Sequence, residues 1–299
     1  PLYSSAASDV YKRQVLGAGD GFMAGFLSGW LRDEPAAECA LYANICGALA
    51  VSRHGCAPSY PSQVELRHMI ETGSEHFALR KDSALEQIHW ATTRRRKHDR
   101  LLAFAFDHRS QFVDMAQANG KSEADIDHFK MIALGAATRS SDRHQGVGLL
   151  VDDRLGRTAL HAASDHDLWI GRPIEQSGVF PLAFEDGPDL GSRLAEWPAN
   201  HCVKVLAPVR TDDQPDVIAY HEAEIVRLAD ACRQTGHELL FEIITGNRDK
   251  SAAPSQVLAL MQRFYDLGVA PDWWKLEPVD DGGFWTCLLY TSPSPRDLS

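Results

Sequence analysis

Residues 202–207 read Cys202-Val203-Lys204-Val205-Leu206-Ala207, a short apolar run that contains one lysine. Such runs are typical of strands buried on both faces of a parallel sheet. Five further runs of this kind occur, at residues 101–106, 146–151, 167–170, 238–244 and 273–276. Helical patterns separate several of them, notably at residues 220–234 and 255–267, which end at Gly236 and Gly268. This alternation of strand and helix predicts βαβ units and an α/β fold with a parallel sheet.

The expected architecture of residues 100–286 is an incomplete (β/α)₈ TIM barrel. A complete barrel has eight strands and typically about 250 residues, and its chemistry lies at the carboxyl ends of the strands. Six strands are predicted here, so the last two units are expected to lie outside this sequence.

Residues 15–66 have a different pattern. Apolar residues at helical spacing predict one helix from about residue 22, and Gly21, Gly25 and Gly29 give it a smooth stripe. A second helix is predicted over residues 36–52, because Pro35 suits its first turn. Two helices cannot bury these apolar faces alone, so the sheet that they would cover is expected to be missing.

The remaining segments are interpreted as connections or tails. Residues 67–99 are charged and irregular and are predicted to form a linker, in which the basic run Arg94-Arg95-Arg96-Lys97 is interpreted as a solvated face. Residues 1–14 and 287–299 resemble translated sequencing-adaptor sequence, and we expect them to pack on neither domain. On this interpretation the chain is an internal fragment of a longer protein.

Composition narrows the class of protein. The 299 residues include 30 basic and 41 acidic side chains, and the net charge of −11 argues against a nucleic-acid partner. No apolar run approaches the roughly 20 residues that cross a bilayer, and no secretory signal is recognised. A cytoplasmic protein without a membrane partner is expected. The six cysteines lack zinc-site spacing and are expected to be reduced.

A glycine turn opens the first helix, with the sequence Val15-Leu16-Gly17-Ala18-Gly19-Asp20-Gly21-Phe22. Such a turn leaves backbone N–H groups unpaired at a helix start, where the helix dipole favours an anion. An aspartate there can act as base toward a hydroxyl that attacks a nucleotide phosphate. Aspartate is also a common N-cap residue, so the turn alone leaves both interpretations open.

The wider segment resembles the ribokinase-like PfkB family of sugar kinases. The resemblance rests on residues 17–27, 42–50 and 53–56. It implies ATP and Mg²⁺ as cofactors, Asp20 as the catalytic base, Asn44 near the nucleotide, and an anion hole formed by Gly17, Ala18 and Gly19. The sequence departs from the family where Val15-Leu16 replaces the Asp-Thr that often precedes this turn. The sugar-binding sheet and lid are absent, so this segment is expected not to phosphorylate a sugar by itself.

Two lysines stand on predicted strands, Lys204 and Lys275, the latter within Trp273-Trp274-Lys275-Leu276-Glu277. A buried ammonium is costly to desolvate, and both burial and a second cation lower a lysine's pKa. The resulting neutral amine can attack a carbonyl and form a Schiff base. For either lysine alone, a salt-bridged residue at a strand end is an equally good interpretation.

The residues at the predicted strand ends resemble those of the class I aldolases of the tagatose-bisphosphate type. The resemblance implies that Lys275 forms the Schiff base and that Lys204 is its charged neighbour. It further implies that Glu242 moves protons and that Asp107 is a polar partner. Arg109 and Arg172 are expected to bind substrate. Neither a metal nor another cofactor is expected for this part.

A sugar kinase followed by such a barrel resembles the bifunctional kinase–aldolase enzymes of myo-inositol catabolism. The resemblance implies phosphorylation of a small sugar acid, then retro-aldol cleavage of the sugar phosphate to dihydroxyacetone phosphate and malonate semialdehyde. The fragment itself is expected to be inactive, and a homo-oligomer is compatible with the sequence.

Two alternatives for the barrel stay open. One is a metal-dependent, class II-like aldolase, in which zinc polarises the carbonyl. Its nearest candidate ligands are His161, Asp165, His166 and Asp167. The other is a non-catalytic barrel that binds sugar phosphates or serves as a scaffold, since a fold does not dictate a function.

Overall fold

The computed structural model describes residues 16–55, 57–93, 98, 100–185, 187–209, 213–244, 254–279 and 282–285. The chain divides into two compact units, with the boundary between residues 97 and 98. The prediction that residues 1–14 and 287–299 pack on neither domain concerns positions outside the described residues. No helix in the described part of the chain is both long and apolar enough to span a bilayer.

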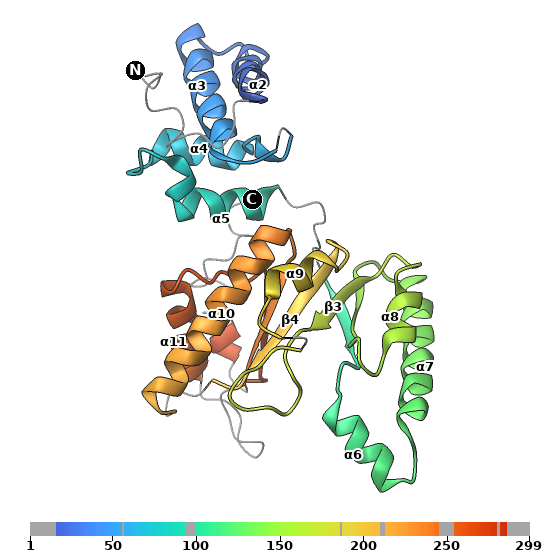
Figure 1. Ribbon diagram of the computed structural model, residues 1–299. Helices are drawn as coiled ribbons and strands as arrows, with labels where there is room; N and C mark the ends of the chain where they lie inside the picture. Colours follow the sequence, from blue (N-terminus) through green and yellow to red (C-terminus); the bar gives the residue numbers. More distant parts are fainter. Residues whose placement is uncertain are drawn as a thin grey trace. The chain divides into compact units, whose positions relative to one another are not determined.

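The first unit is helical (Figure 1). Its elements are α2 (Ala18–Trp30), α3 (Ala36–Ser52), the 3₁₀ turn η2 (Ala57–Ser59), α4 (Gln63–Glu71), η3 (Leu79–Lys81) and α5 (Ser83–Thr92).

Helices α2 and α3 pack through the predicted glycine stripe. A Cβ atom at Gly25 would lie 2.6 Å from the carbonyl oxygen of Tyr42, and one at Gly29 would lie 2.9 Å from Sγ of Cys39. Any side chain at these positions would push the helices apart, because real Cβ atoms do not approach so closely. The two predicted helices and their close contact are therefore confirmed.

Residues 67–99 contain regular structure, so the expectation of an irregular stretch is wrong. Helix α4 begins with a capping box, in which the Ser62 hydroxyl accepts from the Glu65 N–H and the Glu65 carboxylate accepts from the Ser62 N–H. Helix α5 has Asp82 as its N-cap residue, and the Asp82 carboxylate accepts hydrogen bonds from two backbone N–H groups. Asp82 and Glu86 of this stretch are thus a helix cap and an ion-pair partner, and the basic run at residues 94–97 lies outside the described residues.

Arg53, which follows α3, ties these helices together. Its guanidinium is buried, with Nη2 2.7 Å from Oε1 of Glu65 on α4 and Nε 3.0 Å from Oε1 of Glu86 on α5. The other carboxylate oxygen of Glu65 lies 2.8 Å from Nδ1 of His89. A buried carboxylate is tolerated only when it is paired, so α3, α4 and α5 depend on one another.

The second unit is an α/β layer of six parallel strands in the order β1-β2-β3-β4-β5-β6 within the described residues. The strands are β1 (Leu102–Ala105), β2 (Val147–Leu150), β3 (Trp169–Pro173), β4 (His201–Ala207), β5 (Leu239–Ile243) and β6 (Trp273–Leu276). The helices are α6 (Ser110–Ala118), α7 (Glu123–Ser141), α8 (Arg157–Ala163), α9 (Leu190–Ala195), α10 (Pro215–Thr235) and α11 (Pro254–Asp266).

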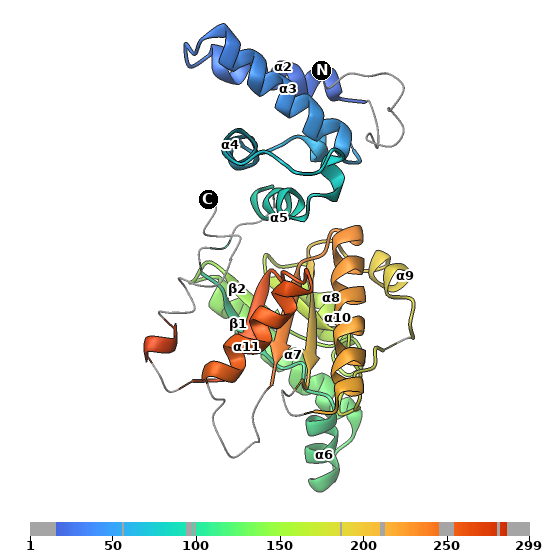
Figure 2. The ribbon, with the colours of Figure 1, turned by 90° about the vertical axis from the view of Figure 1, so that its left-hand side faces the viewer.

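The sheet is curled and open, and its outer face is covered by helices (Figures 1 and 2). Helices α9, α10 and α11 pack on the outward side chains of β4 and β5, and α7 and α8 pack on those of β2. All six predicted strands are confirmed. Within the described residues β1 and β6 each pair with one strand, so the observed architecture is a half-barrel.

The inner face of the sheet has an apolar floor and a charged upper layer. The floor contains Leu150, Trp169, Cys202 and Leu240. Because side chains alternate between the two faces of a strand, Lys204 on β4 and Glu242 on β5 point to the same inner face as this floor. The fold therefore gathers charges above the floor, toward the carboxyl ends of the strands.

We predict that Arg53→Met destabilises the first unit by about 3 kcal/mol or more, because it leaves the fully buried Glu65 without its guanidinium. Hydrogen exchange of the amides of α4 and α5 measures this loss as faster local opening. Arg32→Met is the matched control, since Arg32 pairs with Glu34 at the surface. Equal exchange in the two variants would contradict the role given to Arg53.

Candidate active site

Lys204 is the centre of the charged layer. It is buried on β4, and its Nζ lies 3.0 Å from Oε2 of Glu242, 3.2 Å from Oδ2 of Asp107 and 3.4 Å from Oε1 of Glu175. Asp107 and Glu175 each stand two residues beyond a strand, β1 and β3, while Glu242 is on β5. Three carboxylates from three strands thus converge on one ammonium.

Lys275 lies at the edge of this cluster. It is opposite Glu242 in the register of β5 and β6, and its Nζ is 2.6 Å from Oε1 of Glu242. The Glu242 carboxylate therefore bridges the two lysines, one through each oxygen. The Lys275 side chain is 39% exposed and that of Lys204 is 5% exposed, so a substrate can reach Lys275 more readily.

The neighbouring charges determine the direction in which the pKa values of Lys204 and Asp107 are shifted. Burial by itself favours a neutral Lys204, but Glu175, Asp107 and Glu242 outweigh it and raise the pKa of Lys204 above its ordinary value. Burial therefore does not leave a neutral amine at Lys204, because its carboxylate neighbours favour the ammonium. Burial likewise acts to raise the pKa of Asp107, and Lys204 and Lys275 outweigh it, so this pKa lies below its ordinary value.

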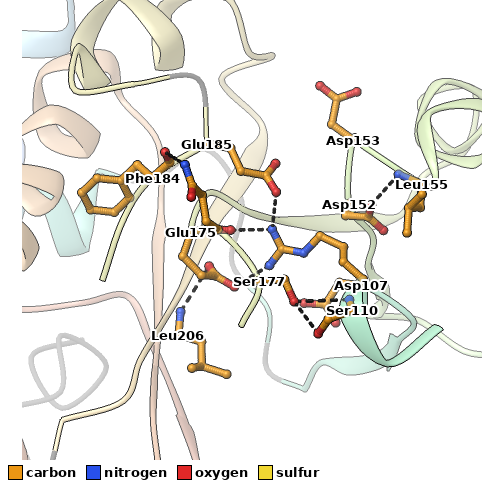
Figure 3. Close-up of polar contacts among 12 residues, drawn as sticks. Asp107, Ser110, Asp152, Asp153, Leu155, Glu175, Ser177, Phe184, Glu185 and Leu206 are labelled. Atoms are coloured by element: carbon orange, nitrogen blue, oxygen red, sulfur yellow. Dashed lines mark hydrogen bonds and ion pairs between the residues drawn. The ribbon is translucent and has the colours of Figure 1, made fainter. Parts of the chain in front are cut away.

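A residue that sequence reasoning missed, Glu175 (Figure 3), is supported by Arg109. Its buried guanidinium donates from Nη2 to Oε1 of Glu175 at 2.7 Å and from Nη1 to Oε1 of Glu185 at 2.8 Å. The same Oε1 of Glu175 contacts Lys204. Arg109 was expected to bind substrate, and in the structure these two carboxylates occupy its guanidinium. Glu175 went unnoticed because β3 was predicted to end at residue 170, five residues before it.

Arg172 does not join the lysine cluster, and its expected role in binding substrate stays a prediction. Strand β3 continues to Pro173, so Arg172 shares the outer face with Ile170 and Ile174, which pack in the helix-facing clusters. Its guanidinium lies 3.8 Å from the ring centroid of Trp197 and forms an ion pair with Asp153.

A further buried lysine comes from a helix. Lys130 of α7 forms an ion pair with Asp152, after β2, and donates to the carbonyl oxygen of His108 at 3.2 Å. Burial lowers the pKa of Lys130, although Asp152 opposes this effect. Because Lys130 is completely covered, it is a structural ion pair and no substrate can reach its amine.

The candidate kinase residues lie on the first unit. Gly17 is the N-cap of α2 and has φ of 81°, a left-handed conformation that favours glycine. Among the described residues no side chain caps this helix start, so its first N–H groups can serve an anion. Asp20 is exposed in the first turn, and exposed Asn44 on α3 donates from Nδ2 to the Ala40 carbonyl oxygen.

The candidate zinc ligands lie far from the lysines along the strands. His161 is on α8, and Asp165 to Asp167 immediately precede β3, at the amino end of the sheet. In the described part of the chain no group of three or more histidine, cysteine or acidic side chains is placed to hold a metal ion.

Two family profiles match the chain in succession. Residues 65–290, more than half of the chain, match the family described as "Uncharacterized protein conserved in bacteria (DUF2090)". Residues 8–63 match the pfkB family of carbohydrate kinases. The ATP-dependent ribose-1-phosphate kinase of Halopiger xanaduensis is 43% identical over 53 residues, which is 18% of each chain. The present chain thus spans less than a fifth of the length of this relative.

We predict that Lys204→Met makes the protein relatively more stable at pH 5 than at pH 8. In the native protein the lowered pKa of Asp107 means that its stabilising effect is complete above about pH 4 and is lost as the pH falls further. The raised pKa of Lys204 means that its effect is complete below about pH 10 and is lost as the pH rises further. Without Lys204 the carboxylates repel one another, and at least one should bind a proton near neutral pH.

The measurement is the urea midpoint at both pH values, compared with that of the unsubstituted chain so that other titrations cancel. Lys275→Met is the control, because it leaves Lys204 in the cluster. A Lys204→Met midpoint that follows the parent at both pH values would contradict the charge balance described above.

Proposed function

The chain belongs to the DUF2090 family, and we propose that its half-barrel is part of a class I aldolase whose Schiff base forms on Lys275. The observation that carries this proposal is the Glu242 carboxylate held between an exposed and a buried lysine. The chain also carries a pfkB carbohydrate-kinase segment ahead of this region. The proposed protein is therefore a sugar kinase fused to an aldolase.

Each residue of the cluster has a proposed step. Lys204 stays protonated, and the Lys275 amine attacks the substrate ketone; the carbonyl oxygen leaves as water and a Schiff base forms. Glu242 removes the proton of the hydroxyl group next to the breaking C–C bond, which splits to give an aldehyde and an enamine on Lys275. Glu242 then returns the proton to the enamine carbon, and water releases the ketone product. Asp107 and Glu175 keep Lys204 charged and in place.

The proposed substrate follows from the order of the two parts. We propose that the kinase phosphorylates 5-dehydro-2-deoxygluconate and that the barrel cleaves the product to dihydroxyacetone phosphate and malonate semialdehyde. The name of the Halopiger relative supports the use of ATP by the first part. The uncapped start of α2 fits an ATP phosphate, with Asp20 beside it as the base, and Mg²⁺ would neutralise the phosphate charge.

Borohydride reduction with a ketose phosphate tests the aldolase proposal in the full-length protein. We expect a secondary amine on Lys275 in the parent, no adduct in Lys275→Ala, and a reduced yield on Lys275 in Lys204→Ala. Mass spectrometry of the trapped peptide identifies the lysine. An adduct on Lys204, or full aldolase activity in Lys275→Ala, would show the assignment wrong.

Asp20→Asn tests the kinase proposal in the same protein. Loss of a general base typically costs about 10² to 10⁴ in rate, so we expect phosphoryl transfer to fall by at least about 10². Cleavage of the phosphorylated sugar should continue at the parent rate, because the two sites share no residue. Two coupled enzyme assays measure the steps separately, and a parallel loss of both activities in a folded variant would count against the assignment.

A further inference from the structure

A cavity of about 560 Å³ opens at the carboxyl ends of β2 and β3, outside the lysine cluster. Arg154 and Arg157 line it from the segment after β2, Ser177 and Glu185 from the segment after β3, and Arg193 from α9. We call this cavity the arginine pocket. Figure 3 shows Ser177, Glu185 and Asp153, which also lines the pocket, near one another at this edge of the sheet.

Among the described residues that line it, the arginine pocket has more arginines than carboxylates. The Asp153 carboxylate forms ion pairs with three guanidinium groups, at 3.1 Å from Nε of Arg157, 3.2 Å from Nη2 of Arg172 and 3.4 Å from Nη2 of Arg193. Among the described residues one carboxylate is thus shared by three cations, and Glu185, a second carboxylate of the wall, is paired with Arg109.

Two of these arginines also form ion pairs at the surface. Arg193 pairs with Glu196 and Arg154 pairs with Glu123, but both glutamates are more than half exposed, and such surface pairs are weak. The pKa of Arg172 responds to the excess: burial lowers it, Arg193 and Arg157 lower it further, and Asp153 offsets this only in part, which leaves a pKa of about 10. An anion that enters the pocket would relieve this repulsion.

The pocket is connected to the lysine cluster by a continuous series of ion pairs. Glu185 lines the pocket and binds Arg109, Arg109 binds Glu175, and Glu175 contacts Lys204. A ligand group in the pocket therefore lies on the same side of the sheet ends as the proposed chemistry.

We infer that the arginine pocket binds the carboxylate end of the sugar-acid substrate. This inference rests on the proposed aldolase function, whose substrate carries an oxyanion at each end. In closed barrels the phosphate is frequently held by the loops after strands seven and eight, and in a ring of eight strands β3 lies opposite strand seven. The substrate end that faces β2 and β3 is then the carboxylate, and paired guanidinium forks suit that planar group.

Malonate is the probe, because it carries the carboxylate of the proposed aldehyde product. Calorimetry on the present chain should detect malonate binding, and Arg157→Gln and Arg193→Gln should each weaken it by at least about tenfold. Arg157 is 69% exposed, so its replacement does not endanger folding. Arg139→Gln is the matched control: Arg139 is exposed 16 residues beyond Glu123 on α7, about 24 Å along the helix, and malonate affinity should not change.

Further measurements distinguish a carboxylate pocket from a phosphate pocket and from the absence of an anion site. Inorganic phosphate that binds more tightly than malonate and loses affinity in both arginine variants would overturn the carboxylate assignment. Malonate binding that is absent, or unaltered in both variants, would overturn the pocket itself. Lys275→Ala should keep the parent affinity for malonate. The pocket would thus stand if borohydride failed to trap Lys275, and the aldolase proposal would stand if malonate failed to bind while trapping succeeded.

Discussion

The ammonium of Lys204, buried on the inner face of the sheet, is the constraint on which the second unit depends. An uncompensated charge there would be too costly to bury, so Asp107, Glu175 and Glu242 must all reach it. They come from three different strands or strand ends. A slip of one residue in any of these strands would turn its carboxylate toward the helices. The ion cluster and the strand register therefore specify each other.

The two lysines of this cluster lie in different environments. Lys204 is enclosed by carboxylates and holds a fixed charge, whereas Lys275 shares one of those carboxylates and remains partly exposed. Similar strands can thus place one lysine among three carboxylates and leave the other partly exposed beside one of them.

The apolar runs were sufficient to predict the six strands, and the strand-end rule correctly brought Asp107, Lys204, Glu242 and Lys275 together. Other features of the site could not be predicted, for physical reasons. Gly171 and Pro173 are poor strand formers, so β3 was predicted too short, which hid Glu175 and left the outward direction of Arg172 unrecognised. Lys130 lies on a helix, and the sequence does not show which strand end a given face of that helix packs against. The protonation of Lys204 depends on carboxylates far apart in the sequence, which periodicity does not reveal.

The two family matches divide the chain near residue 64, whereas the structural boundary follows residue 97. Arg53 lies in the stretch that matches the kinase family, and its buried partners Glu65 and Glu86 lie in the stretch that matches DUF2090. The boundary between the two family matches therefore runs through buried ion pairs of the first unit, so a chain divided near residue 64 would separate Arg53 from both of its acidic partners.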